Sequence, residues 1–532
     1  MATTNLTRYL RSLTLQSHLQ FKALGERLAR HPTTHLSLTS SIFQGGSYDE
    51  NIQLIPRLVN FDVFDRDLSP KMWSLKKKII TTILVTEISW LVQFASAIDA
   101  SAPEAIETRF GVGPYVSALA TSLFLIGFAL GAPIAGPMSE ATGRNPVYIL
   151  SLFCFLISLL IAAVSSSLPF FLMARFAAGF FGSTPLVCAG GSISDLWCAR
   201  DQLVVFPLYA AGGMSGLASG AAAGGILAYV GSINFAQATE WSTLIIGAIV
   251  FVFILLLQPE TYAPILLKWK TGMIVDGMKT DERDMAFPPR KYTCLADDMK
   301  LLSRTLWVAF SEPFIMAFNE PLVMILSVVL SIMYLIVFTL LPGYISIFSG
   351  VYHFGYAARG LTFYGLAVGM LLGLGFAMLL AKYWRKHYPG DTLPTFEAEA
   401  PLDFAVLGIP AVAISLFWMG FTARERISYW SPICASVLLG FGILCTFLSS
   451  YMYIIRAYGL QAASGLVFIT LVRYLLAGGM VVAGVGLFEH IGIAYTFAIM
   501  GVMATLLIPV PFLLYRHGSR LRLRSHRSAR VL

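Results

Sequence analysis

Apolar runs of about 20 residues recur along this chain from residue 79 to residue 515, and they limit what it can fold into. A helix of that length crosses the hydrocarbon core of a bilayer. Because no water is available there, backbone polar groups must bond to one another within each helix. We therefore expect an all-α membrane protein with twelve transmembrane helices, near residues 79–100, 114–136, 146–166, 168–191, 203–229, 240–258, 322–345, 358–381, 402–420, 431–454, 460–488 and 491–515.

Charge is scarce and unevenly placed in the chain. Only 12% of the 532 residues are charged, whereas a soluble domain carries roughly 25%. The net charge of +8 comes from basic clusters at Lys76–Lys78, in the middle of the chain and from Arg516 to Arg530. Basic residues flank membrane helices on the cytoplasmic side. We expect a multi-pass protein of the plasma membrane with both termini cytoplasmic, and the lipid bilayer rather than nucleic acid as its large partner.

The apolar runs fall into two groups of six, separated by a polar segment. Two six-helix, pseudo-symmetric halves around a central cavity are typical of secondary transporters. The expected divisions are a cytoplasmic tail (1–74), a first half (75–258), a central cytoplasmic loop (259–320), a second half (321–515) and a basic cytoplasmic tail (516–532).

Motifs of enzymes are missing from the sequence. The six cysteines have neither metal-type nor disulfide-type spacing. There is no His-Glu zinc motif, nucleophile elbow or glycine-rich phosphate loop with a lysine. We expect no catalytic residues, no metal and no cofactor.

Four of the charged residues inside the predicted spans are candidates for function, because a charge there costs several kcal/mol unless it is paired or hydrated. Arg175 lies about two turns into the fourth span, Glu87 and Asp99 lie in the first, and Arg473 lies deep in the eleventh. Desolvation favours the protonated form of a carboxyl group, which allows it to exchange protons. Glu87, acting with Arg175, is the leading candidate for proton coupling.

Each of these assignments has a structural alternative. Arg175 could extend to the membrane interface, and Glu87 could bond Trp90 or a backbone group. Asp99, near the end of its span, is expected to act mainly as an interfacial cap. The candidates for lining a substrate cavity are Gln93, Asp99, Tyr334 and Arg473.

The segment "GPMSEATGRNP" (136–146) joins the second and third spans. Gly136 and Gly143 suit a tight turn. Glu140 lies near the end of one helix and Arg144 near the start of the next, so these charges can pair across helices and with helix dipoles. Such contacts break when two halves of a transporter move. We interpret this segment as a gating loop.

Two further motifs lie in the fifth span and after the sixth. "GLASGAAAGG" (216–225) places glycines at a spacing that permits close helix packing; they are Gly216, Gly220, Gly224 and Gly225. "QPETYAPILL" (258–267) ends an apolar run with two prolines, an acid and an aromatic residue. Proline resists helix continuation and tyrosine suits the membrane interface, so this segment is interpreted as a stop signal.

Together these motifs resemble the major facilitator superfamily over residues 75 to 520. The loop 136–146, Arg175 with Gly179, and the fifth-span glycines correspond to its signatures, although Ala221 replaces a proline of the antiporter signature. The segment 258–267 is similar to the fungal twelve-span branch of drug:proton antiporters.

The resemblance implies a monomeric, proton-coupled exporter that works by alternating access. Its expected partners are protons and a small organic molecule: a toxin, a secondary metabolite or a drug. In proton-coupled relatives, the arginine that corresponds to Arg175 takes part in coupling. Two alternatives remain at this stage: an organic acid or polyamine transporter of the same fold, and a nutrient sensor that does not transport.

Overall fold

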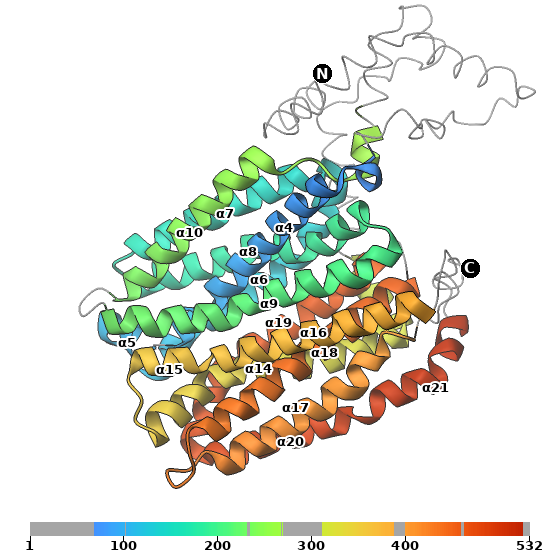
Figure 1. Cartoon of the computed structure of the whole chain (residues 1–532). Coiled ribbons are helices and arrows are strands. Elements are labelled where there is room, and N and C mark those ends of the chain that lie inside the picture. The colour runs from blue at the N-terminus through green and yellow to red at the C-terminus, as the bar shows by residue number, and fades with distance from the viewer. Residues whose placement is uncertain are drawn as a thin grey trace, which may run out of the picture.

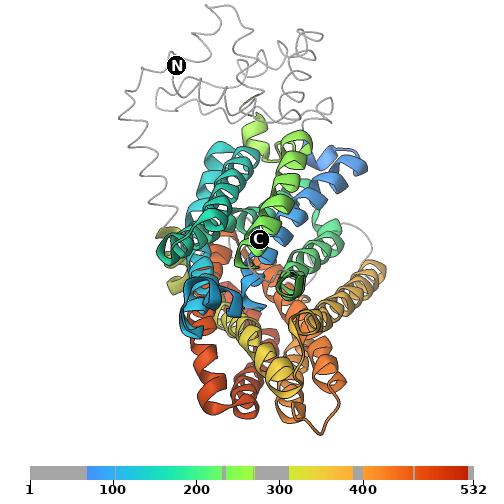
Figure 2. The same ribbon diagram turned by 90° about the vertical axis from the view of Figure 1, so that its left-hand side faces the viewer.

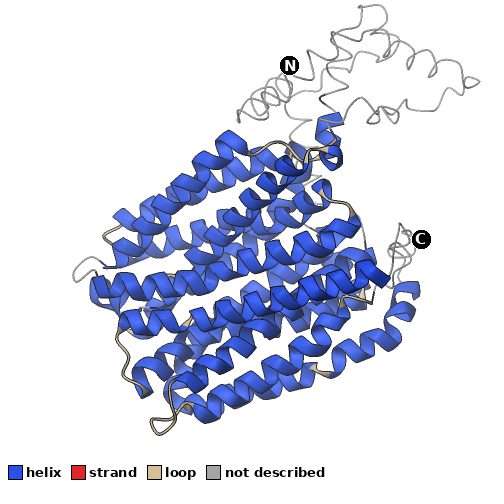
Figure 3. Cartoon of the chain, viewed as in Figure 1, coloured by secondary structure: helices blue, strands red, loops and turns tan. Residues whose placement is uncertain are grey.

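The computed structural model describes residues 69–101, 103–230, 235–267, 269, 311–387, 399–458 and 462–524. Every regular element in these ranges is a helix (Figure 3). Twelve helical spans among them are long and apolar enough to cross a membrane, as predicted. Most of the predicted N-terminal tail and central loop, and the last residues of the basic tail, lie outside the described residues.

The first half forms the upper layer in Figure 1, coloured blue to green. A short helix that the sequence pattern did not predict, α5 (Pro103–Phe110), lies between its first two spans. The spans are α4 (Leu75–Ala97), α6 (Pro114–Thr142), α7 (Arg144–Val164), α8 (Leu168–Leu196), α9 (Ala199–Val230) and α10 (Phe235–Leu257).

The second half forms the lower layer, coloured yellow to red (Figure 1). Its eighth span is divided between two helices, α15 (Tyr356–Thr362) and α16 (Tyr364–His387). The other helices are α14 (Pro321–Tyr344), α17 (Leu402–Thr422), α18 (Trp430–Tyr458), α19 (Ala462–Gly486), α20 (Ile493–Leu507) and α21 (Pro509–Arg524).

Helix α21 extends beyond residue 515, where the last span was expected to end. A proline at the first position of a helix costs no hydrogen bond, so Pro509 divides the span without ending it. Arg522, near the end of α21, forms an ion pair of 2.5 Å with Glu399. The basic residues after Tyr515 therefore continue the helix, and Glu399, which precedes α17, stabilises one of them, Arg522.

The fifth-span glycines bring α9 against both halves. A Cβ atom on Gly216, Gly220 or Gly224 would lie 2.0–2.3 Å from a backbone oxygen of α4 or of Ile98 just beyond it, so only glycine permits this approach. Gly225 instead faces the second half, where its Cβ would lie 2.7 Å from the Cα of Gly360 in α15. The motif therefore packs helices within one half and between the two halves.

The halves meet along α6 with α19 and along α9 with α15 and α16. Figure 2 shows the two layers from the end at which α5 lies. We call this the closed end. The opposite end, where α4 begins and the loop between α6 and α7 lies, is called the open end.

Candidate functional site

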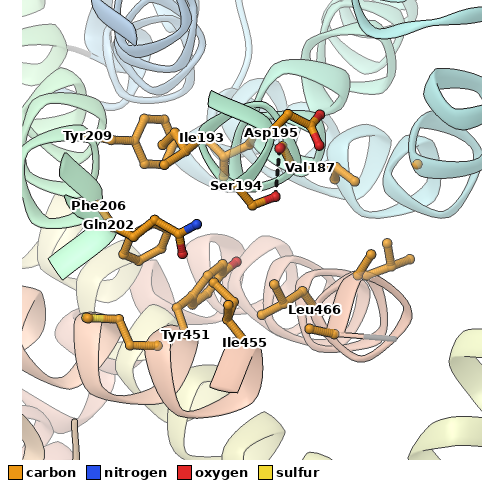
Figure 4. Close-up of a pocket in the computed structure, with 18 of the residues that line it drawn as sticks. Val187, Ile193, Ser194, Asp195, Gln202, Phe206, Tyr209, Tyr451, Ile455 and Leu466 are labelled. Atoms are coloured by element: carbon orange, nitrogen blue, oxygen red, sulfur yellow. Dashed lines mark hydrogen bonds between the residues drawn. The ribbon is translucent and has the colours of Figure 1, made fainter. Parts of the chain in front are cut away.

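A cavity of about 570 Å³ lies between the two halves. Figure 4 shows Phe206 and Tyr209 of α9 on one side, and Tyr451 and Ile455 of α18 on the other. This volume is within the range of small-molecule sites in proteins. The cavity reaches the gating loop at the open end, where Gly136, Glu140 and Arg144 line it.

At the closed end, an ion pair between a buried arginine and a partly exposed glutamate joins the halves. Arg359 of α15 is 1% exposed. Its Nη1 donates to Glu104 Oε1 of α5 at 3.0 Å, and its Nη2 donates to the backbone oxygen of Ser101 at 2.6 Å. The central cavity is therefore accessible from the open end while these contacts hold the closed end together. Arg359 was missed in the sequence because it lies at the edge of an apolar run, where a charge is unremarkable.

Arg175 lies near the closed end with two carboxylates. It is buried in α8, and it forms ion pairs with Asp99 and with Glu240 of α10, the latter at 2.9 Å. Its Nη1 also donates to the backbone oxygen of Ala95 at 3.1 Å. Asp99 is 4% exposed and Glu240 is fully buried. Two buried acids thus share one buried guanidinium. One positive charge does not balance two negative charges, so one of the two carboxyl groups can bind a proton.

The acid that was expected to act beside Arg175 lies elsewhere. Glu87 faces a lateral pocket of about 560 Å³ between α4 and α9, and its side chain is exposed. The expected Glu87–Arg175 partnership is wrong in this structure because twelve residues separate Glu87 from Asp99, roughly 18 Å along a helix. Of the two acids in the first span, only Asp99 reaches the level of Arg175. The expectation that Asp99 is mainly an interfacial cap is also wrong, since it is a buried ion-pair partner.

Three of the four predicted cavity residues come together around Arg473. The guanidinium carbon lies 4.3 Å from the centre of the Tyr334 ring and 5.0 Å from that of Tyr474. Gln93 of α4 donates from Nε2 to the Tyr474 hydroxyl at 3.0 Å. Phe128 of α6 stacks on Tyr474 with ring centres 4.1 Å apart. Residues from both halves therefore meet at this arginine, whereas Asp99 belongs to the Arg175 cluster.

Four aromatic rings surround Arg473; we call them the ring cage, and they belong to Tyr334, Phe447, Tyr451 and Tyr474. The side chain is 0% exposed. Each cation–π contact contributes about 0.5–2 kcal/mol, while burying an ion costs several kcal/mol. None of the three guanidinium nitrogens completes a hydrogen bond within the described residues. The rings stabilise the charge, and the Tyr451 hydroxyl is close enough to interact with the guanidinium, but no carboxylate of the described residues pairs with it.

The expectation that Gly136 forms part of a tight turn is wrong, because α6 continues to Thr142 and only Gly143 of the gating loop lies between helices. Arg144 pairs across helices, but not with Glu140. Gly143 has a φ of +106°, which favours glycine. The Nε of Arg144 donates to Asp195 Oδ2 of α8 at 3.2 Å, and its Nη1 donates to Ser139 Oγ at 3.0 Å. Glu140 is exposed at the mouth of the cavity. Asp195 was missed because a single acid at the end of a span resembles an ordinary boundary residue.

The stop signal after α10 has an additional structural role. Glu260 is 1% exposed, and its carboxylate accepts hydrogen bonds from the backbone N–H groups of Arg144 and Asn145, each at 3.1 Å. It also accepts from Thr261 and Tyr262 at 3.0 and 2.8 Å. Burial raises the pKa of Glu260, and these donors oppose that rise. Glu260 thus caps the N-terminus of α7, a role that the interpretation as a stop signal did not include.

No group of three His, Cys, Asp or Glu side chains in the described ranges could hold a metal ion. The candidate site has two parts. The Arg175 cluster, which consists of Arg175, Asp99 and Glu240, lies at the closed end. The Arg473 ring cage lies beside the central cavity.

Comparisons with known proteins agree with this architecture. Residues 88–479 match the family described as the Major Facilitator Superfamily. The MFS-type transporter kojT of Aspergillus flavus is 35% identical over 477 residues, covering 88% of this chain and 82% of kojT. The MFS-type transporter tndD of Aspergillus flavipes is 28% identical, covering 88% of this chain and 86% of tndD.

Among solved structures, the MFS proton:xylose symporter XylE bound to 6-bromo-6-deoxy-D-glucose has a similar fold. The TM-score is 0.59 at 13% identity, with 84% of this chain and 96% of XylE covered. With a family match over most of its length and twelve helical spans around a central cavity, this chain belongs to the Major Facilitator Superfamily.

Proposed function

We propose that this protein is a proton-coupled exporter of a small organic molecule and that it works by alternating access. The observation that carries the proposal is the pair of buried acids on Arg175 at the closed end of a cavity that is accessible from the other end. The similarity of 258–267 to fungal drug:proton antiporters supports the direction and the coupling ion. Basic clusters near the open end support its placement on the cytoplasmic side of the plasma membrane.

The Arg175 cluster is connected to the contact that closes the cavity. Asp99 and Ser101 are the first and last residues of one short 3₁₀ turn. Asp99 pairs with Arg175, while the backbone oxygen of Ser101 accepts a hydrogen bond from Arg359. Protonation of Asp99 would weaken its pairing with Arg175 and free this turn. The turn would then loosen its hold on Arg359, so that the closed end can open.

Proton flux into proteoliposomes tests this proposal. An imposed pH gradient would be followed with an internal pH dye while organic acids, amines and neutral aromatic compounds are supplied in turn. We expect at least one compound to move against its gradient, coupled to protons. Asp99→Asn and Glu240→Gln should lose gradient-driven transport and retain exchange of compound across the membrane without a gradient.

Glu87 is the second candidate for the coupling acid. It lies in the lateral pocket, whose lining shares Tyr209 with the central cavity. If Glu87→Gln loses gradient-driven transport while Asp99→Asn and Glu240→Gln keep it, the coupling role belongs to Glu87. Compound binding without movement of any compound would contradict transport and favour a sensor.

A further inference from the structure

We propose that Arg473 and its ring cage bind the carboxylate of a planar aromatic anion, and that this anion is the transported molecule. This inference rests on the proposed function and names its substrate class. A guanidinium binds a carboxylate through two parallel hydrogen bonds, and the surrounding rings offer flat apolar surfaces to an aromatic body.

The charge balance of the buried arginines sets Arg473 apart. Arg175 has two acid partners, while Arg144 and Arg359 have one each, Asp195 and Glu104. No carboxylate of the described residues forms an ion pair with Arg473, whose polar neighbours are the hydroxyl groups of its cage tyrosines. The one buried cation of these four that lacks an acid thus lies at the centre of the molecule. A bound anion would supply the missing charge and the missing acceptors.

Access to Arg473 requires only a movement of the cage rings. Phe447 and Tyr451 belong to the cage and also line the central cavity. Thr470 of α19 lines the cavity. Arg473 follows it by three residues and therefore lies on the same face of the helix. One layer of side chains therefore separates the guanidinium from the cavity. Rotation of the Tyr451 side chain would expose the guanidinium nitrogens of Arg473 to a molecule in the cavity.

The cavity wall offers no unpaired acid in its deep part, and this disfavours a cationic substrate. Within the described residues, the wall carries two carboxylates, Asp195 and Glu140. Asp195 is paired with Arg144, and Glu140 lies exposed at the mouth. A polyamine in the deep part of the cavity would thus find no unpaired acid there, and the nearest buried charge behind the wall is the cation of Arg473. Of the two substrate classes that the sequence left open, an organic acid fits this wall and a polyamine does not.

Binding to the full-length protein in lipid nanodiscs tests the inference with three probes of one shape. These are 2-naphthoate, the neutral 2-naphthamide and the cationic 2-(aminomethyl)naphthalene. Affinity is measured by calorimetry without a pH gradient, so a failure of proton coupling does not affect the result. We expect 2-naphthoate to bind at least tenfold more tightly than either other probe.

The variants separate the cage from general electrostatics. Arg473→Gln should weaken 2-naphthoate at least tenfold and leave 2-naphthamide unchanged, and Arg473→Lys should retain part of the preference. Arg456→Gln, which removes a cation from the cavity wall outside the cage, is the matched control and should change the ratio less than threefold.

Three results would overturn the inference: no binding of 2-naphthoate to the wild type, equal affinity for the amide, or an equal loss in Arg456→Gln. If Arg473→Gln does not fold, the affinities of the three probes for the wild type and for Arg473→Lys still test the inference. Coupled transport of a neutral compound, with no binding of 2-naphthoate, would refute the substrate class while leaving the proposed exporter intact.

Discussion

At the scale of single residues, the buried arginines differ in what balances their charge. Arg175 is held by Asp99 and Glu240, whereas Arg473 is held by aromatic rings. Both arginines could be selected from the sequence, because a charge inside an apolar run is conspicuous. The residues that balance their charge could not be assigned from the sequence. Glu240 stands at the start of a predicted span, and the choice between Glu87 and Asp99 depends on which helix level faces Arg175.

Replacing Arg175 should destabilise the protein strongly. Arg175→Met would leave Asp99 and Glu240 buried without their cation, and breaking a buried ion pair costs about 3–5 kcal/mol. Thermal unfolding in detergent would measure the effect as a lower Tm. The exposed Arg516→Gln is the control and should leave Tm unchanged. Restored stability is expected in a triple variant that adds Asp99→Asn and Glu240→Gln; an unaltered Tm in Arg175→Met would refute the structural importance of the cluster.

At the scale of helices, positions follow from the bilayer but contacts do not. The twelve spans were predictable because an apolar run of the right length has few other structures open to it. The lengths of α8 and α21 were underestimated, since a polar or basic residue does not by itself end a helix. The cap that Glu260 provides for α7 joins residues more than a hundred positions apart, and no local pattern reports such a contact.

Removing the cap should weaken α7. In Glu260→Gln, an amide group replaces one carboxylate oxygen that accepts backbone N–H groups, and loss of a helix cap costs about 0.5–2 kcal/mol. We expect a lower Tm in the same detergent. Glu140→Gln changes an exposed acid in the last turn of α6 and should have no such effect. Equal Tm values for the two variants would rule out a capping role for Glu260.

The close contact of α9 with α4 should not tolerate a methyl group. In Gly220→Ala the new Cβ would lie 2.3 Å from the backbone oxygen of Phe94, and overpacking of this kind costs about 1–3 kcal/mol. Gly190→Ala in α8 is the control, because no atom of another element lies within 4 Å of its Cβ position. Thermal unfolding should distinguish the two variants, and a Gly220→Ala protein as stable as Gly190→Ala would contradict the packing described.

At the scale of the whole molecule, ion pairs join the halves at both ends. Arg359 and Glu104 pair at the closed end, and Arg385 of α16 pairs with Asp201 of α9 at 3.1 Å. The first arginine is buried and the second is partly exposed, so water screens the second pair more strongly. The structure with access from the open end is thus the one that its ion pairs favour. Sequence motifs predicted two halves and a cavity, but not which end is closed.

Breaking the Arg359 contact should move the population toward access from the closed end. In a chain whose native cysteines are replaced, Ser349→Cys reports accessibility there, because Ser349 Oγ lies 3.1 Å from Arg359 Nη1. Adding Arg359→Gln should raise the rate of labelling by a membrane-impermeant maleimide severalfold. Arg385→Gln, at the other ion pair between the halves, should not raise it. Equal rates with and without Arg359→Gln would exclude this contact as a determinant of the conformation.

The contact between Gly225 and Gly360 has a consequence for the conformational entropy of the transport cycle. Long side chains lose up to about 2 kcal/mol of rotamer freedom when a contact orders them, and glycine has no side chain to lose it. These two backbones meet across the halves next to Arg359. In the alternating-access cycle proposed above, the closed end would therefore part and rejoin at this point without ordering a side chain, and Arg359 would supply the specificity that the bare backbone lacks.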